Sequence, residues 1–213
     1  MIVIVLSPEE ANRWKYWVDL PVRRELGYWG RPIRPLPNEE KFRFRHNALP
    51  LTRSVTMAIF QGFIKIINTI VTENLENVLI TEDDSIIDWD RLNSLDVDSL
   101  PDTLIYIGGQ AQYPMLKDLK KKCNVDFTDG LNKITDEYRI NGAWGLFIKN
   151  KGVASMILEN IEKKGTYLSS NFDFAISKMH IPKYCIYPAI VTVRSGKSTN
   201  MWNNKSTESF SHY

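Results

Sequence analysis

Cysteine, one-sided charge and long apolar runs are all scarce in this sequence of 213 residues. The two cysteines, Cys123 and Cys185, show no metal-ligand spacing and point to a reducing compartment. A formal net charge of +2 creates no overall field that favours nucleic acid or a membrane surface. No apolar run is long enough to span a bilayer, and no internal repeat is present. We therefore expect a cytoplasmic protein that binds no nucleic acid and inserts into no membrane.

The apolar residues at the start, Met1–Leu6, do not have the features of a signal peptide. The stretch is short, lacks a basic leader and runs into Ser-Pro-Glu-Glu at 7–10, so we predict a first buried strand. Ser-Pro-Glu-Glu is typical of a helix start and predicts a helix that carries Arg13 and Trp17 and ends near Gly27. A glycine-rich fingerprint is missing after the strand, which places any phosphate contacts elsewhere.

The segment Val78–Asp84 has the strongest functional pattern, because an apolar run ends abruptly in Glu82, Asp83 and Asp84. Such runs are typical of buried strands, and ligands of open α/β sheets bind outside the carboxyl ends of the strands. Adjacent carboxylates repel one another unless a positive group joins them, and Mg²⁺ or Mn²⁺ is the usual one. The alternative is a strand that ends in solvated acids.

A long amphipathic helix is predicted before this strand, from Thr52 to about Glu73. Its apolar residues follow a period of 3.6 and are Ile59, Phe63, Ile66, Ile67 and Ile70. Arg53 lies at the helix start, where backbone N–H groups and a guanidinium together suit a phosphate. Residues 28–50 are rich in proline and basic side chains, which predicts either a solvated surface loop or a loop that meets an anionic ligand.

Further strands and helices follow. Leu104–Ile107 is predicted to be a buried strand that ends at a glycine pair, which lets a ligand or a second backbone approach closely. Asn141–Ile148 is expected to be a loop that enters a strand, and residues 153–163 a helix. Asp173 stands at a helix start between two phenylalanines, either as an N-cap or as a functional acid. Ile186–Val193 is predicted to be a last strand broken by a proline.

The order of these elements predicts an α/β domain with a mixed, mainly parallel sheet flanked by helices. We assign residues 1–195 to this single domain. Residues 196–213 are polar, and we expect a flexible tail that is either a lid over the site or a linker to a further domain.

The motifs resemble glycosyltransferases of the GT-A fold, and in particular those of family 25. The resemblance spans most of residues 1–195 and rests on four places. These are the opening strand leading to Arg13, the strand ending in Glu82-Asp83-Asp84, the strand Leu104–Gly108, and Gly142–Ile148 with the acid at Asp173. The acidic sequence looks like the family's acidic motif and the Asp-X-Asp metal site of the wider fold. The Ser-His pair of that family is absent from the long helix.

The resemblance implies an enzyme that transfers a hexose or deoxyhexose, of the glucose or rhamnose type, from a UDP-sugar with Mn²⁺ or Mg²⁺. It implies base, ribose and diphosphate contacts from Ser7, Arg13 and Arg53. Glu82 and Asp83 would meet the ribose or metal-bound water. Asp84 and the tail residue His212 would be metal ligands, and Asp173 would contact the acceptor or act as the base.

As a whole the chain also resembles the first domain of glycosyltransferases encoded by large viruses of chlorella-like green algae. This implies a glycan or glycoprotein acceptor, such as capsid glycans, in the host cytoplasm, and we expect a monomer. Two other functions stay open at this point. One is a nucleotidyltransferase of related fold, and the other is a carbohydrate-binding domain without catalytic activity.

Overall fold

The computed structural model describes residues 1–8, 12–27, 50–112, 127–134, 139–163 and 172–194. The strands in these residues are β1 (Ile2–Pro8), β2 (Val22–Gly27), β3 (Val78–Glu82), β4 (Ser85–Ile87), β5 (Leu104–Gln112), β6 (Gly130–Ile134), β7 (Arg139–Ile148), β8 (Lys183–Tyr187) and β9 (Val191–Val193). The helices are η1 (Asn12–Tyr16), α1 (Pro50–Thr72), α2 (Trp89–Asn93), α3 (Lys151–Lys163) and α4 (Phe172–Ser177).

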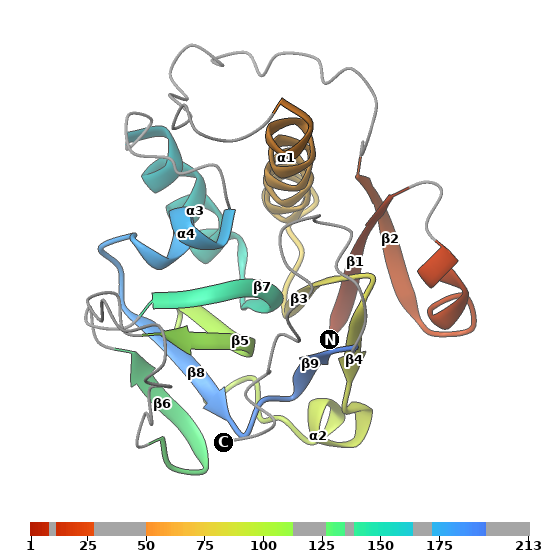
Figure 1. Ribbon diagram of the computed structural model, residues 1–213. Helices are drawn as coiled ribbons and strands as arrows, with labels where there is room; N and C mark the ends of the chain where they lie inside the picture. Colours follow the sequence, from red (N-terminus) through yellow and green to blue (C-terminus); the bar gives the residue numbers. More distant parts are fainter. Residues whose placement is uncertain (9–11, 28–49, 113–126, 135–138, 164–171, 195–213) are drawn as a thin grey trace.

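The strands form one mixed sheet in the order β2-β1-β3-β7-β5-β8-β6, and β9 joins β5 to β4 (Figure 1). β2, β1 and β3 pair in parallel, whereas β7 is antiparallel to both β3 and β5. β8 is parallel to β5, and β6 is antiparallel to β8. β2, β1, β3, β5 and β8 therefore share one direction. The prediction of an α/β fold with a mixed, mainly parallel sheet is confirmed.

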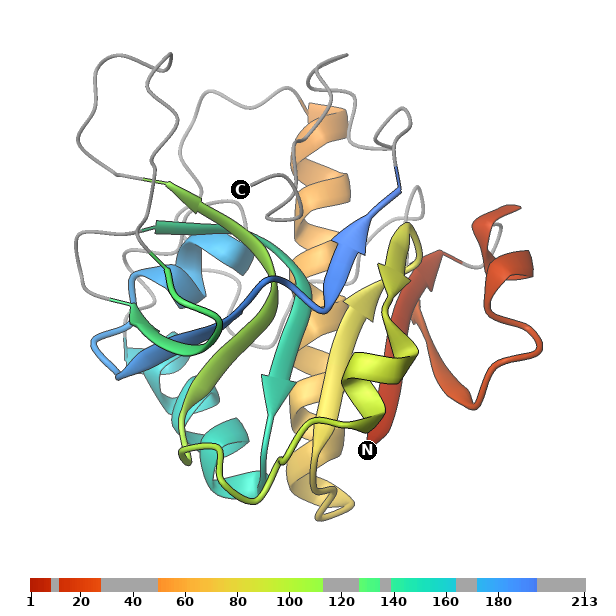
Figure 2. The same cartoon turned by 90° about the horizontal axis from the view of Figure 1, so that it is seen from below.

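Both faces of the sheet are covered by apolar packing, because successive side chains of a strand point to opposite faces. Ile4 and Leu6 of β1 lie in the core beneath α1, α3 and α4. Val3 and Val5 lie in a second core with Trp17 and residues of α2. Figures 1 and 2 show α1, α3 and α4 on one face and α2 on the other. Burial on both faces explains why the strands are continuous apolar runs.

The predicted helix after the first strand is wrong. β1 continues to Pro8, a short 3-10 helix follows at Asn12–Tyr16, and Val22–Gly27 is the strand β2. Residues 7 and 8 pair with residues 26 and 27, so sheet hydrogen bonds prevail over the local helix-start chemistry.

The predicted end of the strand at Gly108 and Gly109 is also wrong, because β5 runs on to Gln112 with register shifts around the glycines. The close backbone approach expected at this pair is present. A Cβ on Gly108 would lie 2.5 Å from the carbonyl oxygen of Val191, and one on Gly145 would lie 2.5 Å from the backbone nitrogen of Gly108. Glycine thus lets β5, β7 and β9 meet.

The loop expected at the start of Asn141–Ile148 is absent, because β7 already begins at Arg139. Several other predictions agree with the structure. α1 spans Pro50–Thr72 and α3 spans Lys151–Lys163, and the last strand is divided at Pro188 into β8 and β9. The short elements β4, α2 and β6 were not predicted. Most of the basic stretch at 28–50, and all of 196–213, lie outside the described residues. Among the helices that the structure describes, none has the length and apolar character needed to cross a membrane.

Candidate functional site

The predicted acids lie at the point where the strand order reverses. β1 pairs with β2 on one side and with β3 on the other. The carboxyl ends of these strands meet at one edge of the sheet (Figure 2). In open α/β sheets the crevice outside such a reversal is the usual ligand site. The fold therefore places the segment Glu82-Asp83-Asp84, here called the acid turn, where a ligand site is expected.

Asp83 is the inner residue of the acid turn and is only 7% exposed. The hydroxyl of Ser7, at the end of β1, donates to Asp83 Oδ2 at 3.2 Å. Trp17 Nε1 donates to the backbone oxygen of Asp83 at 2.9 Å. The turn is thus held from β1 and from the segment that follows η1, which limits its freedom before any ligand binds.

Arg13 is the basic partner of the acid turn. Its Nη1 donates to Asp84 Oδ2 at 3.1 Å and lies 3.7 Å from Asp83 Oδ1. The side chains of Arg13 and Asp84 are 26% and 21% exposed, so this ion pair is partly shielded from water. Arg13 was predicted to contact the nucleotide and Asp84 to bind the metal. In the structure these two residues are bonded to each other.

Negative charge in the acid turn is only partly compensated. Burial raises the pKa of Glu82 well above its ordinary value, and the charges of Asp84, Asp173 and Asp83 raise it further. Burial also raises the pKa of Asp83 and of Asp84, against the lowering effect of Arg13. A group that brings positive charge to this turn would stabilise the ionised forms.

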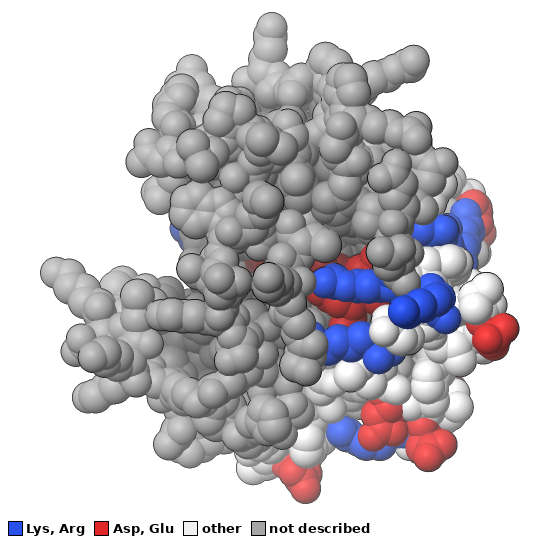
Figure 3. Space-filling view, turned by 45° about the vertical axis from the view of Figure 1, so that its right-hand side comes forward, with Lys and Arg blue, Asp and Glu red and all other residues white. Residues whose placement is uncertain are grey.

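Two further arginines, Arg24 of β2 and Arg194 after β9, border the acid turn. The guanidinium of Arg24 lies 4.6 Å from the ring centre of Trp14, and its Nη2 donates to Ser7 Oγ at 3.4 Å. The guanidinium of Arg194 lies 4.2 Å from the ring centre of Tyr16. Figure 3 shows basic side chains beside partly covered acids at the border of the described residues.

These two arginines were not predicted, and neither was Trp17 as a hydrogen-bond donor to the turn. Arg194 also donates its backbone N–H to the carbonyl oxygen of Asp84 at 2.8 Å. Arg24 and Arg194 carry no local motif, since sheet pairing alone brings them here. The one sequence signal that could have pointed to these arginines is the group of aromatic residues around Trp14, because arginine commonly stacks on such rings.

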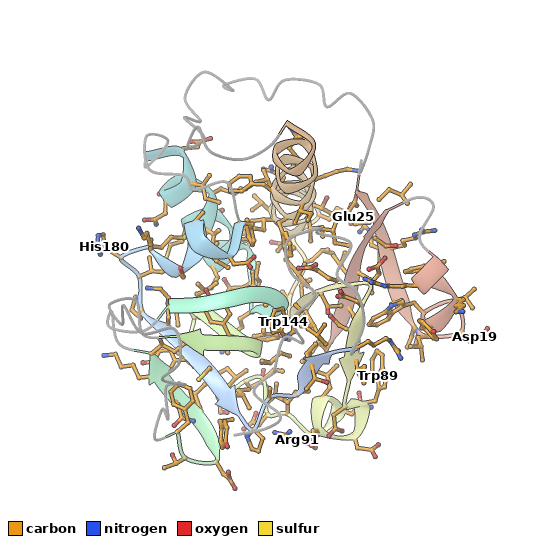
Figure 4. All side chains as sticks on the ribbon, viewed as in Figure 1. Asp19, Glu25, Trp89, Arg91, Trp144 and His180 are labelled. Carbon is orange, nitrogen blue, oxygen red and sulfur yellow. The ribbon has the colours of Figure 1, made fainter. Side chains whose placement is uncertain are left out.

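Asp173 lies in the first turn of α4, and its Oδ2 accepts a hydrogen bond from the backbone N–H of Gly142 at 2.7 Å. The N-cap alternative is therefore wrong, because Asp173 is inside the helix and bonds to strand β7. Gly142 has φ of +81°, and a Cβ there would lie 1.6 Å from the ring of Trp144. Figure 4 labels Trp144 beside β7 and near β9. Glycine is thus required at position 142, whose backbone N–H holds Asp173.

The charge of Asp173 reaches the acid turn and the core. Burial raises the pKa of Glu82 and that of Tyr106, and the charge of Asp173 raises both further. The hydroxyl of Tyr106 is buried and has no hydrogen-bond partner among the described residues. The ring of Phe172 stacks on Phe63 with centres 4.3 Å apart, which fixes α4 against α1. Asp173 and Glu82 thus belong to one electrostatic neighbourhood.

Two predicted site residues remain without a described side chain. Arg53 lies in the first turn of α1, and because α1 leads back to the start of β3, that turn is at the same edge as the acid turn. The side chain of Arg53 is outside the described part of the chain. His212 is entirely outside it. The structure therefore brings together Ser7, Arg13, Glu82, Asp83, Asp84 and Asp173.

The acid turn offers carboxylate oxygens, which are ligands that a hard divalent cation prefers. Within the described residues, no three His, Cys, Asp or Glu side chains are arranged to hold a metal ion by themselves. Mg²⁺ and similar ions are commonly bound through one or two carboxylates, with water and substrate phosphates as the other ligands. Asp83 and Asp84 are two such carboxylates next to each other in the acid turn.

No protein-family model matches this chain, and neither does any curated protein sequence. Among solved structures, A197 from STIV is similar, with a TM-score of 0.40 and 14% sequence identity over 90% of this chain and 83% of that one. A similarity of this strength carries no conclusion about activity.

Proposed function

We propose that this protein is a metal-dependent glycosyltransferase of the GT-A, family 25 type, which moves a hexose or deoxyhexose from a UDP-sugar to a glycan or glycoprotein acceptor. The observation that carries the proposal is the acid turn. It lies where the strand order reverses, and Ser7 and Arg13 bond to it from the neighbouring segments. A viral capsid glycan as acceptor and a glucose-type or rhamnose-type sugar are the finer parts of the proposal.

In this proposal the nucleotide lies over the carboxyl ends of β1 and β3. Ser7 and Asp83 already bond to each other, so they would meet the donor as one pair. Glu82 would contact the ribose or metal-bound water, and Arg53 would approach the diphosphate from the first turn of α1, where free N–H groups favour anions.

Asp84 would hold the divalent cation, with His212 as a further ligand from the tail. When bound, the cation supplies charge stabilisation for the diphosphate that leaves as the sugar–phosphate bond breaks. The protein's own part is to keep Asp84 in place. The buried hydrogen bonds of Trp17 and Ser7 to Asp83, the preceding residue, do this.

Asp173 would act on the sugar side of the site, either as an acceptor contact or as the base. Its carboxylate is oriented by the N–H of Gly142 through Oδ2. A group used for proton transfer has to be held within hydrogen-bond reach of the acceptor hydroxyl. Its electrostatic effect on Glu82 is consistent with a place beside the donor site.

The test is release of UDP from a panel of UDP-sugars with Mn²⁺, with Asp84→Asn as the matched variant. We expect slow UDP release by the wild type, loss on addition of chelator and loss in Asp84→Asn. If no UDP is released from any donor but sugars still bind, the carbohydrate-binding function is correct instead. Pyrophosphate release from a nucleoside triphosphate and a sugar phosphate would instead identify a nucleotidyltransferase.

A further inference from the structure

Arg13 is paired with the carboxylate that is the proposed cation ligand, through one of its two oxygens. Its Nη1 bonds to Asp84 Oδ2 at 3.1 Å and is 3.7 Å from Asp83 Oδ1. A guanidinium and a divalent cation repel each other at such distances, so a cation bound to Asp84 would weaken the Arg13 ion pair. The side chain of Arg13 is 26% exposed, so part of it faces solvent.

The other two arginines of the site have a different setting. Arg24 and Arg194 lie over the rings of Trp14 and Tyr16. The guanidinium of Arg13 instead has the carboxylates of the acid turn as hydrogen-bond and ion-pair partners. A change of charge at Asp84 therefore acts most directly on Arg13.

We propose that Arg13 is an exchangeable counter-ion, which pairs with Asp84 in the free protein and transfers to the diphosphate of the donor when a divalent cation takes its place. This inference rests on the proposed function. The exchange has a consequence for binding affinity. The cation alone binds poorly because it must displace Arg13. When UDP binds, the displaced Arg13 gains the diphosphate as a partner. Cation and UDP each strengthen the binding of the other by the same factor.

Calorimetry with Mn²⁺ alone, UDP alone, and UDP in the presence of Mn²⁺ measures this factor directly. For the wild type we expect it to lie in the usual range for coupled sites, about 5-fold to 150-fold. In Arg13→Gln, Mn²⁺ alone should bind more tightly than in the wild type, whereas UDP with Mn²⁺ should bind less tightly. The factor should therefore fall towards one.

Two variants make the test specific. Arg13→Lys keeps the positive charge, so Mn²⁺ alone should bind as weakly as in the wild type. Arg23→Gln removes a nearby arginine that pairs instead with Glu73 on the surface, and all its binding constants should match those of the wild type. Melting curves of each variant establish that it is folded.

Unchanged or weaker Mn²⁺ binding in Arg13→Gln, with an unchanged coupling factor, would overturn the exchange while leaving the proposed function intact. A wild type that binds UDP-sugars and Mn²⁺ independently would overturn the exchange and also the metal dependence of the proposed function. If the wild type binds no UDP under any of these conditions, the proposed function fails, and the exchange fails with it.

Discussion

The backbone N–H of Gly142 on β7 donates a 2.7 Å hydrogen bond to the carboxylate of Asp173 on α4. This bond links a strand of the sheet to a helix on its face. It orients an acid whose charge is felt at Glu82. The same geometry would be found for an acid that only anchors α4 to β7 and for a catalytic acid. A substitution that keeps the acceptor oxygen distinguishes these two roles.

Asp173→Asn keeps an oxygen that accepts the Gly142 N–H and removes the charge. If Asp173 acts on the acceptor, UDP binding and melting should be unchanged and sugar transfer should fall about 10²-fold or more, the scale of a positioned acid or base. Steady-state transfer and UDP titration measure both. Normal transfer by the variant would leave Asp173 a structural anchor only, and weakened UDP binding with normal transfer would move it into the nucleotide pocket.

Gly142→Ala should be strongly destabilising. Left-handed backbone costs a side chain about 1–2 kcal/mol, and overpacking against the ring of Trp144 adds about 1–3 kcal/mol. Gly130→Ala is the matched control, because it has φ of +100° but no atom within 4 Å of the added Cβ. Urea unfolding of both variants measures the difference. Equal losses would show that the Trp144 contact does not constrain this position.

Trp17→Phe should loosen the acid turn. The change leaves the buried carbonyl of Asp83 without its 2.9 Å donor, at a cost of about 1–3 kcal/mol. Trp89→Phe is the control, since Trp89 packs at the edge of the same core (Figure 4). We expect unfolding free energy and UDP affinity to fall together in Trp17→Phe. If Trp17→Phe loses stability but keeps full UDP affinity, the acid turn is not part of the UDP site.

The acid turn also predicts a pH dependence of stability. The folded-state pKa of Glu82 is raised above its unfolded value of about 4.3, so this group favours folding fully below that pH and loses its contribution as pH rises through the folded pKa. In metal-free buffer, Glu82→Gln should therefore melt higher than the wild type at pH 8, and the gap should shrink towards pH 4.

The control for this measurement is Glu73→Gln. The pKa of Glu73 is lowered by its hydrogen bond to Arg23, so its contribution has the opposite sign and is lost as pH falls. A gap between Glu82→Gln and the wild type that is constant with pH would mean that Glu82 is not desolvated in the folded protein.

Local patterns predicted the parts of the molecule that depend on neighbours in sequence. The 3.6-residue period identified α1, and the abrupt change from apolar to acidic residues identified the end of β3. Local chemistry failed at residues 7 and 8 and at Gly108, where pairing with β2 and β9 decides the backbone.

The contacts of the site depend on residues far apart in the chain. Ser7 and Asp83 are separated by 76 residues and Arg13 and Asp84 by 71, so their pairing follows from the strand order and from no motif. Arg194 arrives through the pairing of β9 with β4. The sequence therefore predicted where the acids lie better than it predicted what surrounds them.

The most direct test of the account is the affinity for a UDP-sugar with Mn²⁺ and with chelator, measured by calorimetry on the wild type and on Asp84→Asn. We predict that chelator sharply lowers the affinity of the wild type and changes that of Asp84→Asn little. The variant should remain as stable as the wild type or become more stable, because charge repulsion in the acid turn is relieved. Equal affinity of the wild type with Mn²⁺ and with chelator would contradict the metal-dependent site at the acid turn.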